Sequence, residues 1–147
     1  MVTGGAGFLL AVLWFDLMFD VQVWGHHDAE LPGEVLVSIA AYYRRVTTDA
    51  RPMNRLVVVA MLTTIGGAIG ELVDHVGPAW GAWASLVLAT SPVLVAGIRT
   101  VPSAVRLGGR SDDTRGQSAL ARSILRDHCL CLVAVAAVLI VQAVSAV

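Results

Sequence analysis

Four stretches of this 147-residue chain are apolar over the length that a helix needs to cross a lipid bilayer. A hydrocarbon core of about 30 Å requires roughly 17 to 25 helical residues. Runs of that length cover residues 5–24, 53–73, 78–98 and 124–147. Charged residues make up only 14% of the chain, whereas a soluble domain carries about 25%. The sequence therefore predicts an all-α integral membrane protein, with residues 1–147 forming one transmembrane domain built as a four-helix bundle.

The segments between these runs carry the polar residues. Residues 34–46 predict a short helix with a partly apolar face, which at this length lies along the membrane surface. The alternative is that this segment extends the second span as a bent helix. Residues 99–123 are rich in Gly, Ser, Asp and Arg, which predicts a flexible inner loop. Ser118 or Ser123 would then cap the fourth span.

The placement of positive charge predicts the orientation. All ten basic residues are arginines, and they lie within residues 44–55 and 99–126. Because loops rich in positive charge stay in the cytoplasm, we expect both segments inside and both termini outside. A net charge of −1 excludes the broad basic surface of a nucleic-acid-binding protein. The predicted location is a bacterial plasma membrane, with multiple spans and the lipid bilayer as partner.

Small residues in the second run indicate close helix packing. Gly66 and Gly70 have the small-xxx-small spacing that lets two helix backbones approach in lipid. The spacing predicts a helix contact there, either within the chain or between copies in a homo-oligomer.

Several acids and histidines lie in or beside the apolar runs at the inner leaflet. Asp16 and Asp20 are spaced i, i+4 and so share one face of the first span. His26 and His27 follow that span, and Asp127 and His128 open the fourth; we refer to these as the inner cluster. Ionisable residues in hydrocarbon usually pair with one another and often mark functional sites. We therefore expect these side chains to converge near the cytoplasmic leaflet.

Three interpretations of the inner cluster remain open. A transition metal would be held by carboxylate and imidazole ligands drawn from Asp16, Asp20, His26, His27 and His128. A proton or substrate relay would instead use catalytic residues, namely Asp16, Asp20, Asp127 and His128. In a purely structural cluster, Arg122 or Arg126 would neutralise the aspartates and the histidines would be interfacial.

A second group of polar residues closes the second apolar run at the outer side. Glu71, Asp74 and His75 lie there, and Glu71 and His75 have i, i+4 spacing. This outer cluster is a second, less favoured metal candidate. The alternative is a helix end solvated by water.

Three short pieces of the sequence occur in a characteristic order. They are the YYRRV segment at residues 42–46, Pro102 after the third run, and the Arg126-Asp127-His128 opening of the fourth. This layout resembles the small four-span membrane proteins related to anthrone oxygenases, although Asp16 and Asp20 are additions to that pattern. The resemblance implies a membrane bundle that oxidises or binds a flat hydrophobic molecule, and it carries across one site residue, His128.

The function that these patterns favour is a polar site near the cytoplasmic leaflet that binds or acts on a small hydrophobic molecule. A membrane oxidoreductase with a transition-metal cofactor is one form of it. Two alternatives belong to other classes. One is a proton-coupled transporter or channel component working as a homo-oligomer, and the other is a non-catalytic subunit of a membrane complex.

Overall fold

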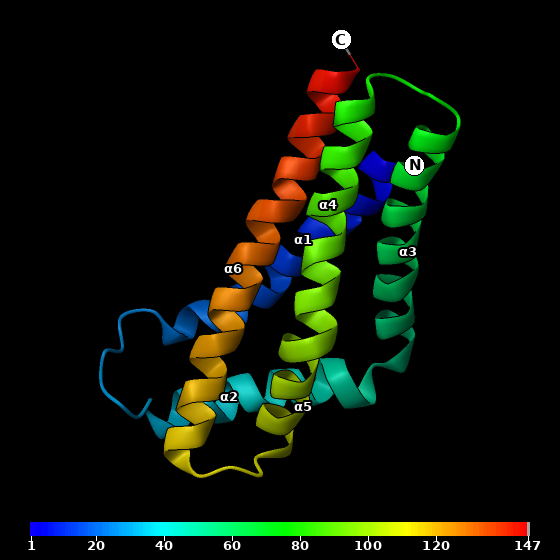
Figure 1. Cartoon of the computed structure of the whole chain (residues 1–147). Coiled ribbons are helices and arrows are strands. Elements are labelled where there is room, and N and C mark those ends of the chain that lie inside the picture. The colour runs from blue at the N-terminus through cyan, green and yellow to red at the C-terminus, as the bar shows by residue number, and fades with distance from the viewer. Residues whose placement is uncertain (147) are drawn as a thin grey trace.

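The structure, a computed structural model, describes residues 1–146, with all of their side chains except those of residues 51–53. It is all-α. Four helical segments are long and apolar enough to cross a membrane: Val2–Val23, Asn54–Val73, Ala79–Gly109 and Thr114–Ser145. They pack side by side, with the start of the first and the end of the last at the same end of the bundle (Figure 1). The predicted fold class is confirmed.

The long helices are α1 (Val2–Asp20), α3 (Arg51–Val73), α4 (Ala79–Val95) and α6 (Thr114–Ser145). A 3₁₀ turn, η1 (Val21–Val23), extends α1, and a π-helical turn, η3 (Ala96–Thr100), joins α4 to the short helix α5 (Val101–Gly109). Pro102 near the start of α5 has no N–H to donate to the turn before it. Around the bundle, α6 contacts α1 and α4, and α3 contacts the same two helices.

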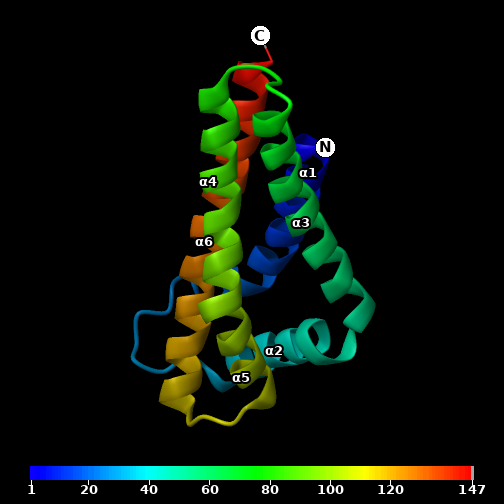
Figure 2. The same cartoon turned by 45° about the vertical axis from the view of Figure 1, so that its right-hand side comes forward.

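The short helix expected between the first two spans is α2 (Gly33–Arg44), which lies across one end of the bundle (Figure 2). Its buried residues follow the i, i+3, i+4, i+7 spacing of one helix face. These residues are Leu36, Ile39, Ala40 and Tyr43. A π-helical turn, η2 (Arg45–Asp49), follows, and Ala50 leaves the helical conformation before α3 begins. The second span is therefore a separate helix and not an extension of α2.

The predicted loop at residues 99–123 is helical except for the turn at 110–113, so that prediction is wrong. Ala104 and Leu107 of α5, and Ala121 and Ile124 of α6, are buried at helical spacing in one core cluster. Tertiary packing of these apolar residues outweighs the loop-like composition around them. The cap of α6 is neither Ser118 nor Ser123, because the Asp113 side chain accepts a hydrogen bond from the Gly116 N–H.

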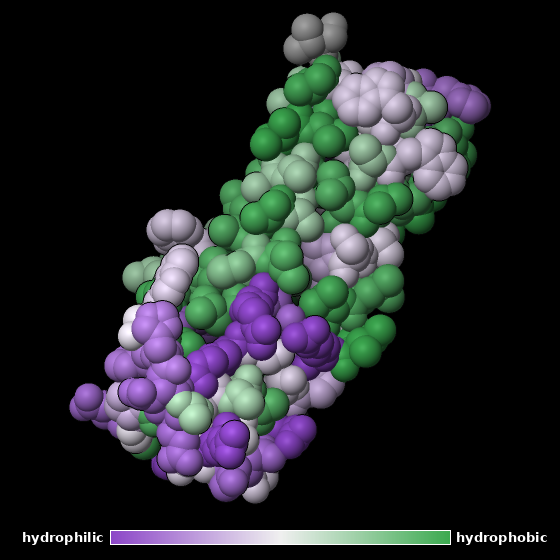
Figure 3. Space-filling model, turned by 60° about the vertical axis from the view of Figure 1, so that its left-hand side comes forward, coloured by the Kyte–Doolittle hydropathy of each residue, from purple (hydrophilic) through white to green (hydrophobic). Residues whose placement is uncertain are grey.

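Two hydrophobic cores stabilise the molecule at different levels. One lies within the spans and includes Val2, Ala6, Ala68 and Val138. The other lies where α2, α5 and the start of α6 meet. We call this second region the arginine end, because the arginine-bearing segments 44–55 and 99–126 meet there. On the face drawn in Figure 3, hydrophobic residues cover the spans, and most of the hydrophilic residues lie at this end.

Helix α6 is longer than the hydrocarbon core of a bilayer is thick. Its 32 residues span about 48 Å, which exceeds the roughly 30 Å of a hydrocarbon core. With one face of the hydrocarbon placed at Ser145, the last residue of α6, a distance of about 30 Å counted back along the helix ends near Leu125. The first part of α6 therefore projects beyond the hydrocarbon, together with α5 and α2.

The small residues of α3 do not pack as expected within the chain. A Cβ added at Gly66 or Gly70 would meet nothing within 4 Å, so neither glycine forms a helix contact in the described residues. The close approach uses Gly67, where an added Cβ would lie 3.0 Å from Val2, and Gly5, where it would overlap Thr64. One residue is a rotation of 100° about a helix, and α1 packs on that neighbouring face. A contact between chain copies through Gly66 and Gly70 stays a prediction.

Candidate functional site

Three side chains from three helices meet in a buried group at the arginine end of the spans. The carboxylate of Asp20 accepts a hydrogen bond from the Tyr43 hydroxyl at Oδ1, over 2.5 Å. Its other oxygen, Oδ2, lies 2.6 Å from Nδ1 of His128. The exposed fractions are 1% for Asp20, 2% for Tyr43 and 8% for His128. Both oxygens of a carboxylate buried from water are thus satisfied by polar partners, as burial requires.

Each member of this group is placed by the way its helix packs. Asp20 is the last residue of α1, and Tyr43 lies on the buried face of α2. His128 lies about one turn of α6 above the boundary near Leu125, on the face that packs into the bundle. The group therefore lies near that boundary, and Tyr43 belongs to the hydrophobic core at the arginine end.

A second carboxylate on α1 is held by the neighbouring tyrosine. The Tyr42 hydroxyl donates to Oδ1 of Asp16 over 2.6 Å. Phe19 stacks on the Tyr42 ring, with centroids 4.0 Å apart. Asp16 is less buried than Asp20. Two adjacent tyrosines of α2 therefore bind two acids that lie one turn apart on α1.

Asp127 is also buried, but its carboxylate contacts different residues from those that contact Asp20. Its Oδ2 lies 3.3 Å from the Thr100 hydroxyl and 3.3 Å from Nε of Arg99, both in η3. A cation therefore neutralises this acid and ties α6 to the turn between α4 and α5. Asp127 shares no hydrogen bond with Asp16, Asp20 or His128 among the side chains that the structure describes.

The remaining members of the inner cluster lie outside this group. Arg122 donates to the backbone oxygens of His26, Asp28 and Ala29, at 3.3, 2.5 and 3.2 Å. The loop carrying His26 and His27 is thus fixed through its backbone. Within residues 1–146, neither imidazole hydrogen-bonds to Asp16 or Asp20, and no ion pair joins Arg122 or Arg126 to these acids. The neutralising partners predicted for the structural cluster are therefore wrong.

The outer cluster does not have the geometry predicted for it. Helix α3 ends at Val73, and His75 adopts a positive φ of 54° beyond the helix. Glu71 and His75 therefore do not share a helical face, although their spacing suggested it. Glu71 instead accepts a hydrogen bond from Gln142 of α6, at 2.9 Å. Asp74 is exposed at the helix end.

The arrangement around His128 determines what chemistry it can perform. A carboxylate only accepts hydrogen bonds, so the close Asp20 contact places a proton on Nδ1 and makes Nε2 the basic nitrogen. Among the described side chains, no group of three or more His, Cys, Asp and Glu residues could hold a metal ion. The transition-metal interpretation gains no support from this geometry and stays a prediction. With Nδ1 occupied by Asp20, Nε2 is the ring nitrogen that remains able to accept a proton.

The tyrosine hydroxyls are permanent donors to the two acids. Burial raises the pKa of Tyr43, and the charge of the neighbouring Asp20 carboxylate raises it further. The pKa of Tyr42 is raised in the same way, by burial and by Asp16. Both hydroxyls therefore stay protonated throughout the physiological pH range, and both hydrogen bonds to α1 persist.

Reasoning from the sequence did not assign a site role to Tyr42, Tyr43 or Thr100. A usable signal existed for Tyr43, because it lies on the apolar face of a short amphipathic helix. A tyrosine hydroxyl buried on such a face needs a hydrogen-bond partner.

Comparison with family models, with curated proteins and with solved structures finds no match to this chain. The fold defines its class as a small polytopic membrane protein with four candidate spans. Its most distinctive internal feature is the buried, hydrogen-bonded group of Asp20, Tyr43 and His128.

Proposed function

We propose that this protein binds a small hydrophobic molecule at the cytoplasmic edge of the plasma membrane and exchanges a proton with it through His128. The observation that carries the proposal is the carboxylate of Asp20, buried between the Tyr43 hydroxyl and Nδ1 of His128. This proposal places the arginine end in the cytoplasm and both termini outside, in accordance with the positive-inside rule.

Asp20, Tyr43 and His128 have separate roles in this exchange. Nε2 of His128 takes a proton from an acidic group of the bound molecule. Asp20 fixes the imidazole tautomer and stabilises the positive charge that develops on the ring, as a carboxylate does when it is bonded to a general base. Tyr43 holds the other carboxylate oxygen and keeps Asp20 aligned. Asp16 and Tyr42 hold α2 against α1.

The resemblance to proteins related to anthrone oxygenases adds a candidate substrate shape. It implies a flat hydrophobic molecule and an oxidation, and removal of an acidic proton is a usual first step in oxidising such a molecule. A transition metal at Nε2 would be an alternative use of the same nitrogen. Metal-bound histidines commonly donate their second ring N–H to a carboxylate, as Nδ1 does here.

The proposal is tested with 2-naphthol, a flat hydrophobic weak acid whose anion absorbs at longer wavelength than its neutral form. We expect the wild-type protein in lipid nanodiscs to lower the pH at which bound naphthol ionises by about one unit. That shift corresponds to about 1.4 kcal/mol of preference for the anion beside a protonated imidazole. His128→Gln should return the midpoint to that of empty nanodiscs, and Asp20→Asn should reduce the shift.

Equal midpoints for wild type and His128→Gln would contradict proton exchange at this histidine. Glu30→Gln, in the exposed loop after α1, is the matched control and should behave as wild type. Elemental analysis of the same preparations tests the metal interpretation. A stoichiometric metal that disappears with His128→Gln would replace proton exchange by metal chemistry.

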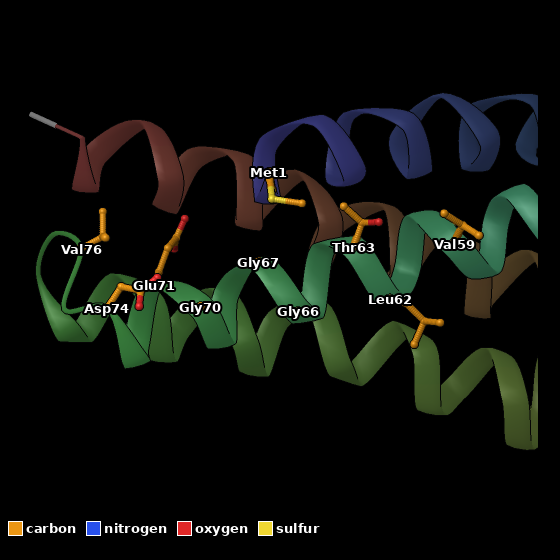
Figure 4. A pocket seen from close by; sticks show the side chains of 10 residues that line it. All are labelled: Met1, Val59, Leu62, Thr63, Gly66, Gly67, Gly70, Glu71, Asp74 and Val76. Atoms are coloured by element: carbon orange, nitrogen blue, oxygen red, sulfur yellow. The ribbon is translucent and has the colours of Figure 1, made fainter.

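A second candidate function is proton-coupled transport by a homo-oligomer. A groove of about 550 Å³ runs along α3 past Gly66 and Gly70, and Glu71 extends from it toward α6 (Figure 4). No helix of the described chain covers these glycines. Close approach of a second α3 helix there would follow the small-residue packing of membrane helices.

Oligomeric state in lipid nanodiscs and in detergent tests this candidate. Gly66→Leu should convert an oligomer to monomers, because the added side chain fills the open face without a clash inside the chain. Gly97→Leu is the control, since Gly97 is also exposed and meets nothing within 4 Å. A wild-type protein that is monomeric in both media would contradict the oligomeric carrier.

A further inference from the structure

A shallow apolar groove of about 400 Å³ lies on the surface of the bundle at the arginine end, where the end of α1 approaches α6. It is lined by Trp24, Leu125, Arg126, Cys129 and Leu130. Trp24 is 72% exposed and Leu130 is 67% exposed, so the groove faces the surroundings of the bundle. Because Leu125 lines it, the groove lies at the hydrocarbon boundary of the arginine end. The groove therefore has an apolar wall toward the bilayer centre and a rim at the level of the lipid headgroups.

The charge at the rim is uncompensated. Nε of Arg126 donates to the backbone oxygen of Arg122 over 3.4 Å, which fixes the base of the guanidinium. No carboxylate within the described part of the chain forms an ion pair with Arg126. Arg122, one turn away, is occupied by three backbone oxygens of the loop after α1. Arg126 is therefore a cation with free donors beside an apolar groove.

We propose that this groove binds one anionic phospholipid from the leaflet at the arginine end. The phosphate accepts hydrogen bonds from the Arg126 guanidinium, as at other basic lipid sites beside membrane helices. An acyl chain lies along Leu125, Cys129 and Leu130 toward the bilayer centre. Trp24 packs against the glycerol region, the level at which tryptophan accumulates in membrane proteins. Charge and depth together select this occupant over a neutral lipid.

Native mass spectrometry tests the site on the full chain, released from nanodiscs of phosphatidylcholine that contain a minor fraction of phosphatidylglycerol. We expect the wild-type protein to retain one phosphatidylglycerol molecule. Arg126→Gln should reduce that retention about tenfold, the loss expected for charge-assisted hydrogen bonds. The control is Arg115→Gln, which removes the same charge from the same helix about 16 Å away, beyond the membrane boundary. It should retain lipid as wild type does.

Two outcomes would overturn the proposal. Equal losses in Arg126→Gln and Arg115→Gln would show attraction to net charge alone. Equal retention of phosphatidylcholine and phosphatidylglycerol by wild type would show an apolar surface without headgroup recognition. Trp24→Ala tests the same groove without removing a charge, and it should also weaken the retention of phosphatidylglycerol. His128→Gln should leave retention unchanged, so this test is independent of the proposed proton exchange.

Discussion

Replacing His128 with leucine is expected to cost about 3–5 kcal/mol of the free energy of unfolding in the wild-type background, and little or nothing when Asp20 is also leucine. The first value is typical of leaving a buried charge without its partner, because the Asp20 carboxylate stays buried after the imidazole that is hydrogen-bonded to it is removed. With both residues leucine, only the Tyr43 hydroxyl loses its partner. Unfolding by SDS, monitored by the helix signal in circular dichroism, measures these differences for wild type, the two single variants and the double variant.

The single replacement Asp20→Leu should cost less than His128→Leu, about 1–3 kcal/mol. The Tyr43 hydroxyl already lies 3.5 Å from Nδ1 of His128 and gains that nitrogen as an acceptor when the carboxylate is gone. Leu130→Ala, on the exposed side of α6, is the control and should change stability by less than about 0.5 kcal/mol. Additive costs for the two leucine replacements would contradict a coupled pair.

Gly108→Ala should destabilise the protein by about 1–3 kcal/mol, the usual cost of overpacking. A Cβ at this position would lie 2.7 Å from the backbone N of Arg44 and 2.9 Å from its Cα. Neither backbone atom can move without shifting α2, and α2 carries Tyr43. The variant should therefore also reduce the naphthol shift, because Tyr43 moves away from Asp20. Unfolding and naphthol titration of the same preparation give both readings.

Gly109→Ala provides the matched control for this crossing of α2 and α5. Nothing lies within 4 Å of a Cβ added at Gly109, and alanine is the better helix former. Its stability should equal or slightly exceed that of wild type. Equal behaviour of the two alanine variants would contradict the close approach of α5 to α2.

The spans could be predicted from the sequence because hydrophobic length is a property of each segment by itself. Helix α5 and the first turns of α6 could not be predicted in this way. Glycine, serine and arginine around residues 99–123 indicate a loop when each residue is considered alone. They become helical because Ala104, Leu107, Ala121 and Ile124 bury one continuous apolar face against α2.

The candidate site was predictable in part. Depth in the membrane and i, i+4 spacing bring Asp16, Asp20 and His128 into consideration. The choice of partners depends on helix rotation, which the sequence does not report. Asp127 and His128 are neighbours in the chain, yet a turn of 100° sends one to Arg99 and the other to Asp20. The same rotation makes Gly67, and not Gly66, the contact of α3 with α1.

The two tyrosines of α2 have a mechanical consequence. A surface helix held at one point can swivel about it, whereas α2 is fastened through adjacent residues to acids one turn apart on α1. Any sliding or rolling of α2 across the end of the bundle must therefore move both acids at once. Lateral pressure or a change in bilayer thickness that displaces α2 would therefore alter the hydrogen bond between Asp20 and the His128 imidazole.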